Sequence, residues 1–304
     1  MRAVCSFFLK VRDQAPRIGG QRDKEDLMGL RINTNTTSLS AQRTLGVNND
    51  KQAKALGKLS SGTRITRSAD DAAGLAISEK LKATIRGQAQ AERNANDGIS
   101  MIQTAEGGLS EVGNILIRMR ELSVQAASDT VGDTERSFTD LEYQNLKQEA
   151  ERISQVTEFN GKKLLNGAGE SYDFQIGINN DDFQDRIKFD TEALNSSIES
   201  LGVSELAVVS KEDAQNALSS LDMAIEKVSG QRAELGAKQN RLSSTVQNLQ
   251  VSNENLSAAN SRIRDTDYAA ETANNAKLNI LNAAGTSVLA QSNAQGQNAL
   301  KLIG

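Results

Sequence analysis

Three groups of carboxylates are the residues of this 304-residue chain whose types and spacing could do chemistry. They are Asp70–Asp71, Asp181–Asp182, and Glu149 with Glu151. Paired carboxylates hold hard cations such as Ca²⁺, or act together in acid–base catalysis. The same groups also have structural interpretations as a helix cap, a turn and a solvated helix face. We favour the structural interpretations, and therefore predict no catalytic residue, no metal ligand and no cofactor.

The composition argues against an enzyme. The chain has no His, which is the commonest general base and metal ligand, so its many Ser and Thr residues have no imidazole to activate them. Gly107–Gly108 lacks the Gly-Lys-Ser/Thr sequel of a phosphate-binding loop. The single cysteine, Cys5, cannot form an intramolecular disulfide. These absences favour a structural or binding protein.

Charge and hydropathy exclude two further classes of partner. The net charge is -4 and no Lys/Arg block occurs, so we expect no nucleic-acid surface. No run of 18 apolar residues occurs, so we expect no membrane insertion. Aromatic residues make up 3% of the chain against 38% for hydrophobic residues, and the only proline is Pro16. This composition favours long, thin helices that pack through small aliphatic side chains.

The elements that must position any functional residue are dominated by a heptad repeat near the C-terminus. Apolar residues recur every seven positions, at Leu221, Val228, Leu235, Leu242, Leu249, Leu256 and Ile263. A second row lies three residues earlier in each repeat, and four of its seven members, Arg232, Gln239, Asn253 and Asn260, are polar. Alternating spacings of three and four predict a coiled-coil seam, and polar seam residues fix its register. One long helix is therefore expected from about 212 to 263.

A second long helix is expected to run from about Ser68 to about Gly132. Ser68 can cap its start, and Asp70–Asp71 supply acidic residues there. Asp133 or Thr134 can cap a third helix that stops before Asn160–Gly161. Alternation at Tyr172, Phe174, Ile176 and Ile178, and again at Ile187 and Phe189, predicts a small β-hairpin around the turn 179–182. The expected fold is mainly α: an elongated antiparallel helical bundle or coiled-coil rod with a small β-hairpin region.

The two ends of the chain are weaker helices. The N-terminal one has scattered apolar residues that include Ile32 and Leu39, with a break at Ser60–Gly62. The C-terminal one carries Leu278, Leu281, Val288 and Leu302. Neither has enough apolar contacts to offset a cost of about 1 to 2 kcal/mol for each ordered residue. We expect the two segments to pair and to become ordered only on assembly.

The domain boundaries follow from these elements. We expect a leader or mis-assigned start at 1–27, a terminal helix at 28–70, a rod at 71–263 with its hairpin region around 170–205, and a second terminal helix at 264–304. Residues 24–27 read as an in-frame translation of a purine-rich ribosome-binding sequence, which is the basis for the hypothesis that Met28 is the true start. A genuine leader is the alternative.

Several separated motifs stand out along the chain. In the N-terminal half they are Leu59–Ile65, Asp70–Gly74, Asn94–Ser100 and Gln103–Gly107; in the C-terminal half they are Leu235–Leu242, Ser261–Ile263, Asp267–Ala269 and Ala284–Gln291. In this order they resemble the motifs of bacterial flagellin. The resemblance runs from about Met28 to Gly304. It implies a subunit that is exported unfolded, with the help of an export apparatus and a chaperone, and that polymerises under a filament cap into the extracellular flagellar filament. The terminal helices would form the inner tube and the rod the outer tube, which is smooth because no large surface domain is present.

The resemblance carries over three single positions as well. Arg118, Leu122 and Glu149 match the surface that a host innate-immune receptor reads on flagellins, with Arg118 and Leu122 one helical turn apart. The alternative interpretation is structural: Arg118 is a solvated charge on the helix, and Leu122 packs in the seam. Two other functions stay open at this point: a hook–filament junction protein, which shares the terminal helices, and an unrelated coiled-coil adaptor.

Overall fold

The computed structural model describes residues 34–168 and 171–301. The predictions for the leader 1–27, for the start at Met28, and for Ile32 and Leu302 lie outside the described residues. Contacts divide the chain into two compact units. Unit 1 combines the residues up to Ser61 with those from Asp267 onward, and unit 2 runs from Gly62 to Thr266.

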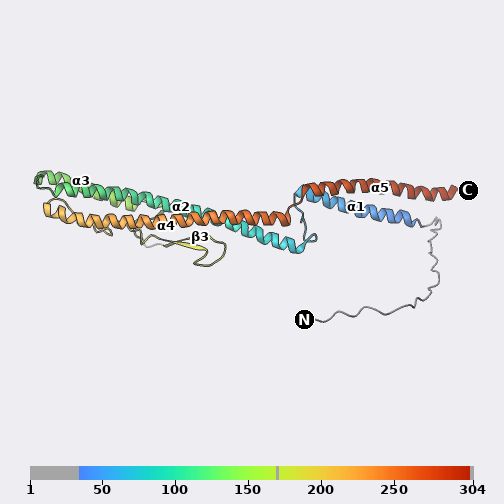
Figure 1. Cartoon of the computed structure of the whole chain (residues 1–304), viewed down its shortest axis with the longest axis horizontal. Coiled ribbons are helices and arrows are strands. Elements are labelled where there is room, and N and C mark those ends of the chain that lie inside the picture. Colours follow the sequence, from blue (N-terminus) through green and yellow to red (C-terminus); the bar gives the residue numbers. More distant parts are fainter. Residues whose placement is uncertain (1–33, 169–170, 302–304) are drawn as a thin grey trace, which may run out of the picture. The chain divides into compact units, whose positions relative to one another are not determined.

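Unit 2 is built on two long antiparallel helices, α2 (Ala72–Ala126) and α4 (Lys211–Arg264), which lie side by side in Figure 1. An ion pair of 2.6 Å joins Arg120 to Asp222 near one end of this pair. The shorter helix α3 (Asp133–Val156) folds back along the C-terminal half of α2. The heptad repeat thus predicted α4 to within one residue at each end.

Each long helix begins at a side-chain cap. The Asp71 carboxylate accepts a hydrogen bond of 2.9 Å from the Gly74 N–H, so Asp71, and not Ser68, caps α2. The Ser210 hydroxyl accepts from the Asp213 N–H at 3.1 Å and caps α4. The prediction that Asp133 or Thr134 caps α3 was wrong. Gly132 occupies that position, and its N–H donates to the Glu135 carboxylate at 2.7 Å.

The strand region contains two short antiparallel pairs. β1 (Glu158–Phe159) pairs with β2 (Lys162–Lys163), and β3 (Ser171–Gln175) pairs with β4 (Arg186–Asp190). The predicted hairpin exists, but its first strand ends at Gln175 and does not extend to Ile178. The reason is Asp185: its carbonyl and carboxylate accept hydrogen bonds from four backbone N–H groups in the loop, those of Ile176, Gly177, Asn179 and Asp181.

Three glycines of α2 accept side chains from the 157–178 segment. A Cβ atom on Gly87 would lie 2.9 Å from Ile178, one on Gly98 would lie 3.1 Å from Phe174, and one on Gly108 would lie 2.7 Å from Leu165. Spacings of about three helical turns place all three glycines near one face of α2. The glycines therefore hold the hairpin region against the helix.

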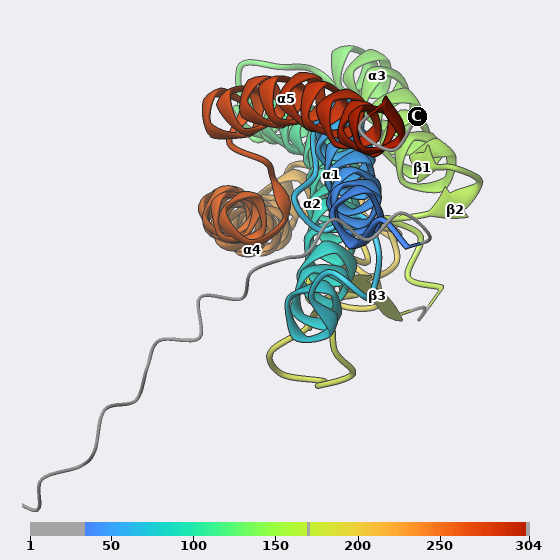
Figure 2. The same ribbon diagram turned by 90° about the vertical axis from the view of Figure 1, so that its right-hand side faces the viewer.

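Unit 1 consists of two antiparallel helices, α1 (Thr36–Ser61) and α5 (Tyr268–Lys301), which run alongside each other in Figures 1 and 2. The predicted break after Ser60 is confirmed, because α1 ends at Ser61 and Gly62 takes a φ of 69°. The two weak terminal segments do pair with each other. None of the described helices is long and apolar enough to cross a bilayer.

Candidate assembly surface

The contact between α1 and α5 is largely polar. The Asn35 side-chain amide donates to the Ser292 carbonyl oxygen at 2.9 Å, and the Ser38 hydroxyl donates to the Asn293 amide oxygen at 2.9 Å. Further along the pair, the Gln52 amide donates to Asn279. Hydrogen bonds of this kind fix the register of two helices but stabilise them by only about 1 kcal/mol each.

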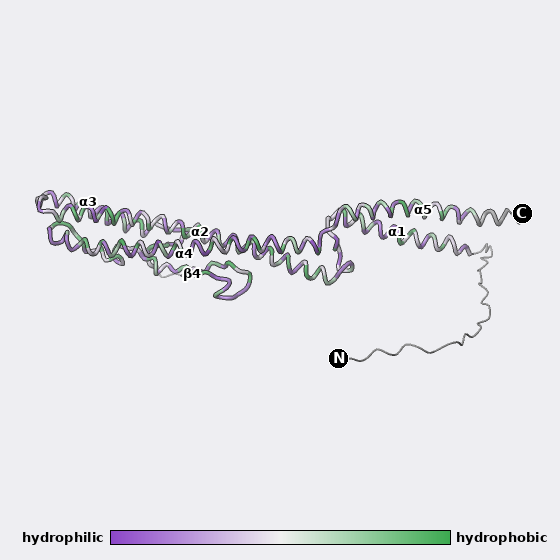
Figure 3. Tube along the Cα trace, viewed as in Figure 1, coloured by the Kyte–Doolittle hydropathy of each residue, from purple (hydrophilic) through white to green (hydrophobic). Residues whose placement is uncertain are grey.

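Little apolar surface is buried in unit 1. Its buried side chains, among the described residues, are Ser38, Ala55, Leu278 and Ser292. Seven large apolar side chains remain exposed: Leu39 (54%), Val47, Leu56, Tyr268, Ile280 (70%), Leu281 (40%) and Val288 (55%). Apolar residues in fact recur along the whole of both helices in Figure 3. Of the residues predicted to pack the terminal helices, Leu278 is buried within the unit, whereas Leu39, Leu281 and Val288 are not.

The heptad seam is buried unevenly along α4. Leu221, Val228, Leu235 and Leu242 are covered completely or almost so, whereas Leu249, Leu256 and Ile263 are half-buried. The covered half packs against a core that includes residues of α3 and of the 194–208 segment. The other half is a contact of α2 with α4, where polar pairs replace apolar ones.

Two of these polar pairs lie in the half-buried part of the seam, from Leu249 to Ile263, which we call its open half. The Ser78 hydroxyl donates to the Asn260 amide oxygen at 2.9 Å, and the Gln88 amide donates to the Ser252 hydroxyl at 2.9 Å. Asn260 was singled out by the heptad pattern as a residue that fixes register, and this pair gives it that contact. Its partner Ser78 was not predicted, because a serine between apolar positions carries no signal of its own.

The three positions carried over from the receptor surface do not form one exposed face. Arg118 is half exposed and pairs with Glu121 and Glu142, whose carboxylates raise the pKa of the guanidinium. Leu122, one helical turn further along α2, is 2% exposed and belongs to the core. Arg152 binds the Glu149 carboxylate and lowers its pKa.

The carboxylate groups have structural roles. Asp71 caps α2, and Asp181 accepts from the N–H groups of Phe183 and Gln184, both at 2.9 Å, within the hairpin loop. Glu151 accepts from the Ile198 N–H at 2.8 Å. Within residues 34–168 and 171–301, no cluster of three or more metal-ligating side chains occurs. These carboxylates therefore stabilise the fold locally, at a helix start, in a loop and against the 194–208 segment.

Comparison with known proteins identifies the family. Residues 32–170 match the bacterial flagellin N-terminal helical region, and residues 218–303 match the bacterial flagellin C-terminal helical region. A flagellin of Halalkalibacterium halodurans is 44% identical over 274 residues, which cover 90% of this chain and 99% of that protein. The chain belongs to the flagellin family. The flagellin of Bacillus subtilis is 41% identical over 313 residues, which cover 90% of this chain and 100% of the relative.

A solved structure is also similar. The crystal structure of Bacillus cereus flagellin is 31% identical and covers 52% of this chain and 88% of its own, with a TM-score of 0.46. Membership of the family makes this flagellin a structural subunit of the flagellar filament, which self-assembles and is not an enzyme.

Proposed function

We propose that α1 and α5 join copies of this flagellin into the inner tube of the filament, and that unit 2 forms the outer tube. The observation that carries the proposal is the exposure of seven large apolar side chains on a helix pair that buries only Ala55 and Leu278 among its described apolar residues. Covering a Leu, Ile or Val side chain completely contributes about 1.5 to 3 kcal/mol. Neighbouring copies supply that cover.

Export of the chain in an unfolded state, and its location outside the cell, are the further parts of the proposal. Passage through a narrow channel requires a chain that can unfold and refold without a covalent cross-link. Its single Cys5 leaves no intramolecular disulfide to break. The export apparatus, an export chaperone and the filament cap are the partners that such a route involves.

A host innate-immune receptor is a separate partner implied by the resemblance. The exposed side chains of Arg118 (50%) and Glu149 (43%) support contact with it, whereas the burial of Leu122 does not. The carried-over surface is therefore reduced to two charged residues.

Seeded elongation tests the assembly role. Purified monomer is mixed with short filament fragments, and length is followed by electron microscopy. The double variant Leu281→Ser, Val288→Ser should keep the monomer's helix content but elongate at least tenfold more slowly, since both side chains are exposed in unit 1. Met223→Ser is the matched control, because Met223 is 64% exposed on α4. Finite rings in place of filaments, or normal elongation of the double variant, would contradict the proposal.

A further inference from the structure

The sequence contains two Asn-Gly pairs, and both follow α3. Asn160–Gly161 forms the turn between β1 and β2, and Asn166–Gly167 lies three residues beyond β2. Asparagine is a chemically labile residue. It is most labile before glycine, because no side chain then shields the next backbone nitrogen from the asparagine amide carbon. The surroundings of the two pairs decide which of them can react.

Asn160–Gly161 lies in an open turn. Asn160 has a φ of 49° and Gly161 a φ of 76°, and positive φ at both central residues is typical of a type I′ turn. Both residues are exposed, and a Cβ atom on Gly161 would meet nothing within 4 Å. The Asn160 side chain has no hydrogen-bond partner among the described residues. The amide carbon of Asn160 is therefore free to approach the Gly161 nitrogen.

Asn166–Gly167 is held in place. The Asn166 amide oxygen accepts a hydrogen bond from the Ala168 N–H at 3.1 Å. A Cβ atom on Gly167 would overlap the side chain of Asn195, so that side chain covers the glycine. Leu165, directly before the pair, is completely buried. The Asn166 amide therefore cannot turn toward the Gly167 nitrogen without losing these contacts.

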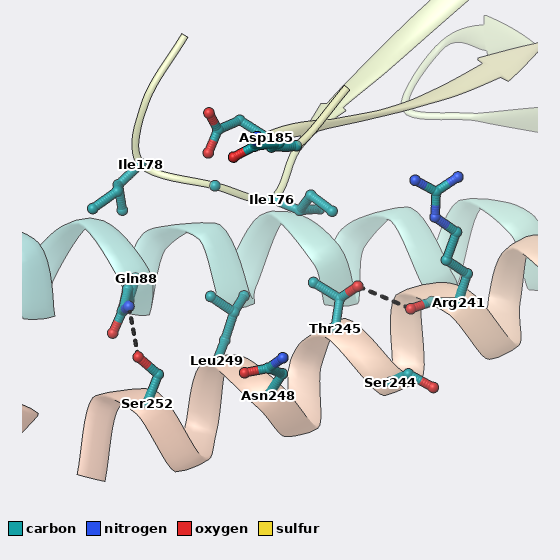
Figure 4. Close-up of a pocket in the computed structure, with 12 residues that line it drawn as sticks. Gln88, Ile176, Ile178, Asp185, Arg241, Ser244, Thr245, Asn248, Leu249 and Ser252 are labelled. Atoms are coloured by element: carbon teal, nitrogen blue, oxygen red, sulfur yellow. Dashed lines mark hydrogen bonds between the residues drawn. The ribbon is translucent and has the colours of Figure 1, made fainter. Parts of the chain in front are cut away.

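An exposed asparagine within a helix is protected in a different way. Asn248 is exposed on α4, and Leu249 follows it on the same helix (Figure 4). The helix holds the Leu249 N–H in a hydrogen bond to the carbonyl oxygen four residues earlier, and the Leu249 side chain hinders access to this nitrogen. Exposure alone therefore does not make an asparagine reactive. Asn160 combines exposure with a following glycine and a position outside the regular ladder.

We propose that Asn160 is a site of spontaneous modification, at which the amide is converted to a mixture of isoaspartate and aspartate. The Gly161 nitrogen loses its proton to hydroxide and attacks Cγ of Asn160, so a C–N bond forms and the side-chain amide leaves as ammonia. Water then opens the resulting succinimide ring. Opening at Cγ gives aspartate, and opening at the backbone carbonyl carbon gives isoaspartate. Overall, one water is consumed and one ammonia is released.

Isoaspartate breaks the turn. Its main chain runs through Cβ and Cγ and so contains one additional carbon atom, which a two-residue type I′ turn does not accommodate. Next to the turn, the Leu164 N–H donates to the Thr157 carbonyl oxygen at 3.2 Å, and Leu164 is completely buried. The modification therefore loosens the segment that joins α3 to the core. Aspartate adds a charge but keeps the turn, because Asp also adopts positive φ.

Peptide mapping tests the proposal within one molecule. The purified full-length protein is kept at mildly alkaline pH, either folded or in urea, and is then digested with trypsin. Cleavage after Arg152, Lys162, Lys163 and Arg186 places the two pairs in separate peptides, 153–162 and 164–186. Tandem mass spectrometry locates the gain of about one dalton that the conversion produces.

In the folded protein, Asn160 should convert at least tenfold faster than Asn166, whereas in urea the two should convert at similar rates. Conversion of Asn160 no faster than that of Asn166 in the folded protein overturns the proposal. An equal preference for Asn160 in urea also overturns it, because the neighbouring sequence and not the fold would then select the site.

Two glycine variants provide a second test. Asn160→Gly removes the amide and keeps the turn, since Gly-Gly suits a type I′ turn. Asn166→Gly is the matched control. Aged samples are treated with an isoaspartate methyltransferase and a labelled methyl donor, and circular dichroism checks that the variants fold. Asn160→Gly should lose most of the label that the parent acquires, and Asn166→Gly should keep it. Parental labelling of Asn160→Gly overturns the assignment.

Discussion

A terminal carbon of Leu165 lies 2.7 Å from the position that a Cβ atom on Gly108 would occupy. Leu165 is completely buried, so this contact belongs to the core of unit 2 and not to its surface. Glycine destabilises a helix interior by up to about 1 kcal/mol relative to alanine. At Gly108 that cost is offset by a side chain that fills the space.

Adjacent glycines provide a matched test of this contact. Gly108→Ala should lower the free energy of unfolding by about 1 to 3 kcal/mol, because the new methyl group overlaps Leu165 and Thr157. Gly107→Ala should raise it by up to about 1 kcal/mol, since a Cβ atom there meets nothing within 4 Å. Urea titration followed by circular dichroism measures both. Equal effects of the two substitutions would show that Leu165 does not occupy this space.

Arg136 holds the turn between α2 and α3. Its guanidinium donates to the carbonyl oxygens of Ala126 at 2.9 Å and Ser128 at 3.0 Å. Arg136→Ala removes both of these hydrogen bonds, and should lower the free energy of unfolding by about 1 to 3 kcal/mol. Arg152→Ala, at an exposed ion pair, is the control and should change it by less than about 0.5 kcal/mol. A loss at Arg136 no larger than the control's would refute this role.

Tyr143 is completely buried, and its hydroxyl has no hydrogen-bond partner among the described residues. Tyr143→Phe should therefore raise the free energy of unfolding by about 1 kcal/mol at neutral pH.

The same burial raises the pKa of the Tyr143 hydroxyl above its usual value of 10.0. Since the unfolded chain loses this proton first, the parent should lose stability as the pH rises above about 10, and Tyr143→Phe should lose less. Urea titrations of both proteins between pH 7 and pH 11 measure the difference. Parallel pH profiles would contradict this interpretation.

Periodic features of the sequence predicted the long helices well. The heptad row from Leu221 to Ile263 predicted the position of α4, and the break at Ser60–Gly62 predicted the end of α1. Both signals come from residues that are close in sequence, so they do not depend on tertiary contacts. The caps were harder to predict. Asp71 and Ser68 were both able to cap α2, and the choice of Asp71 depends on where the Gly74 N–H lies.

Long-range contacts could not be predicted from local pattern. The alternation through Ile176 and Ile178 suggested a longer strand, but the Asp185 carbonyl oxygen accepts from the N–H groups of both Ile176 and Gly177, and its carboxylate accepts from that of Asn179, so the chain turns into the loop there. Gln231 donates to the carbonyl oxygens of Ala193 and Asn195, and so holds the 191–203 segment on α4. Leu122 was carried over as a receptor contact from the family resemblance, whereas core packing decides its burial.

Hydrogen exchange, measured on dilute monomer and on assembled filament, tests the central claim most directly. In the monomer, amides of α1 and α5 should exchange much faster than those in the covered half of α2, because unit 1 buries so few side chains. In the filament, the same amides should become protected. Monomer in which α1 and α5 exchange as slowly as the core of unit 2 would contradict the account, because the terminal helices would then be complete without neighbours.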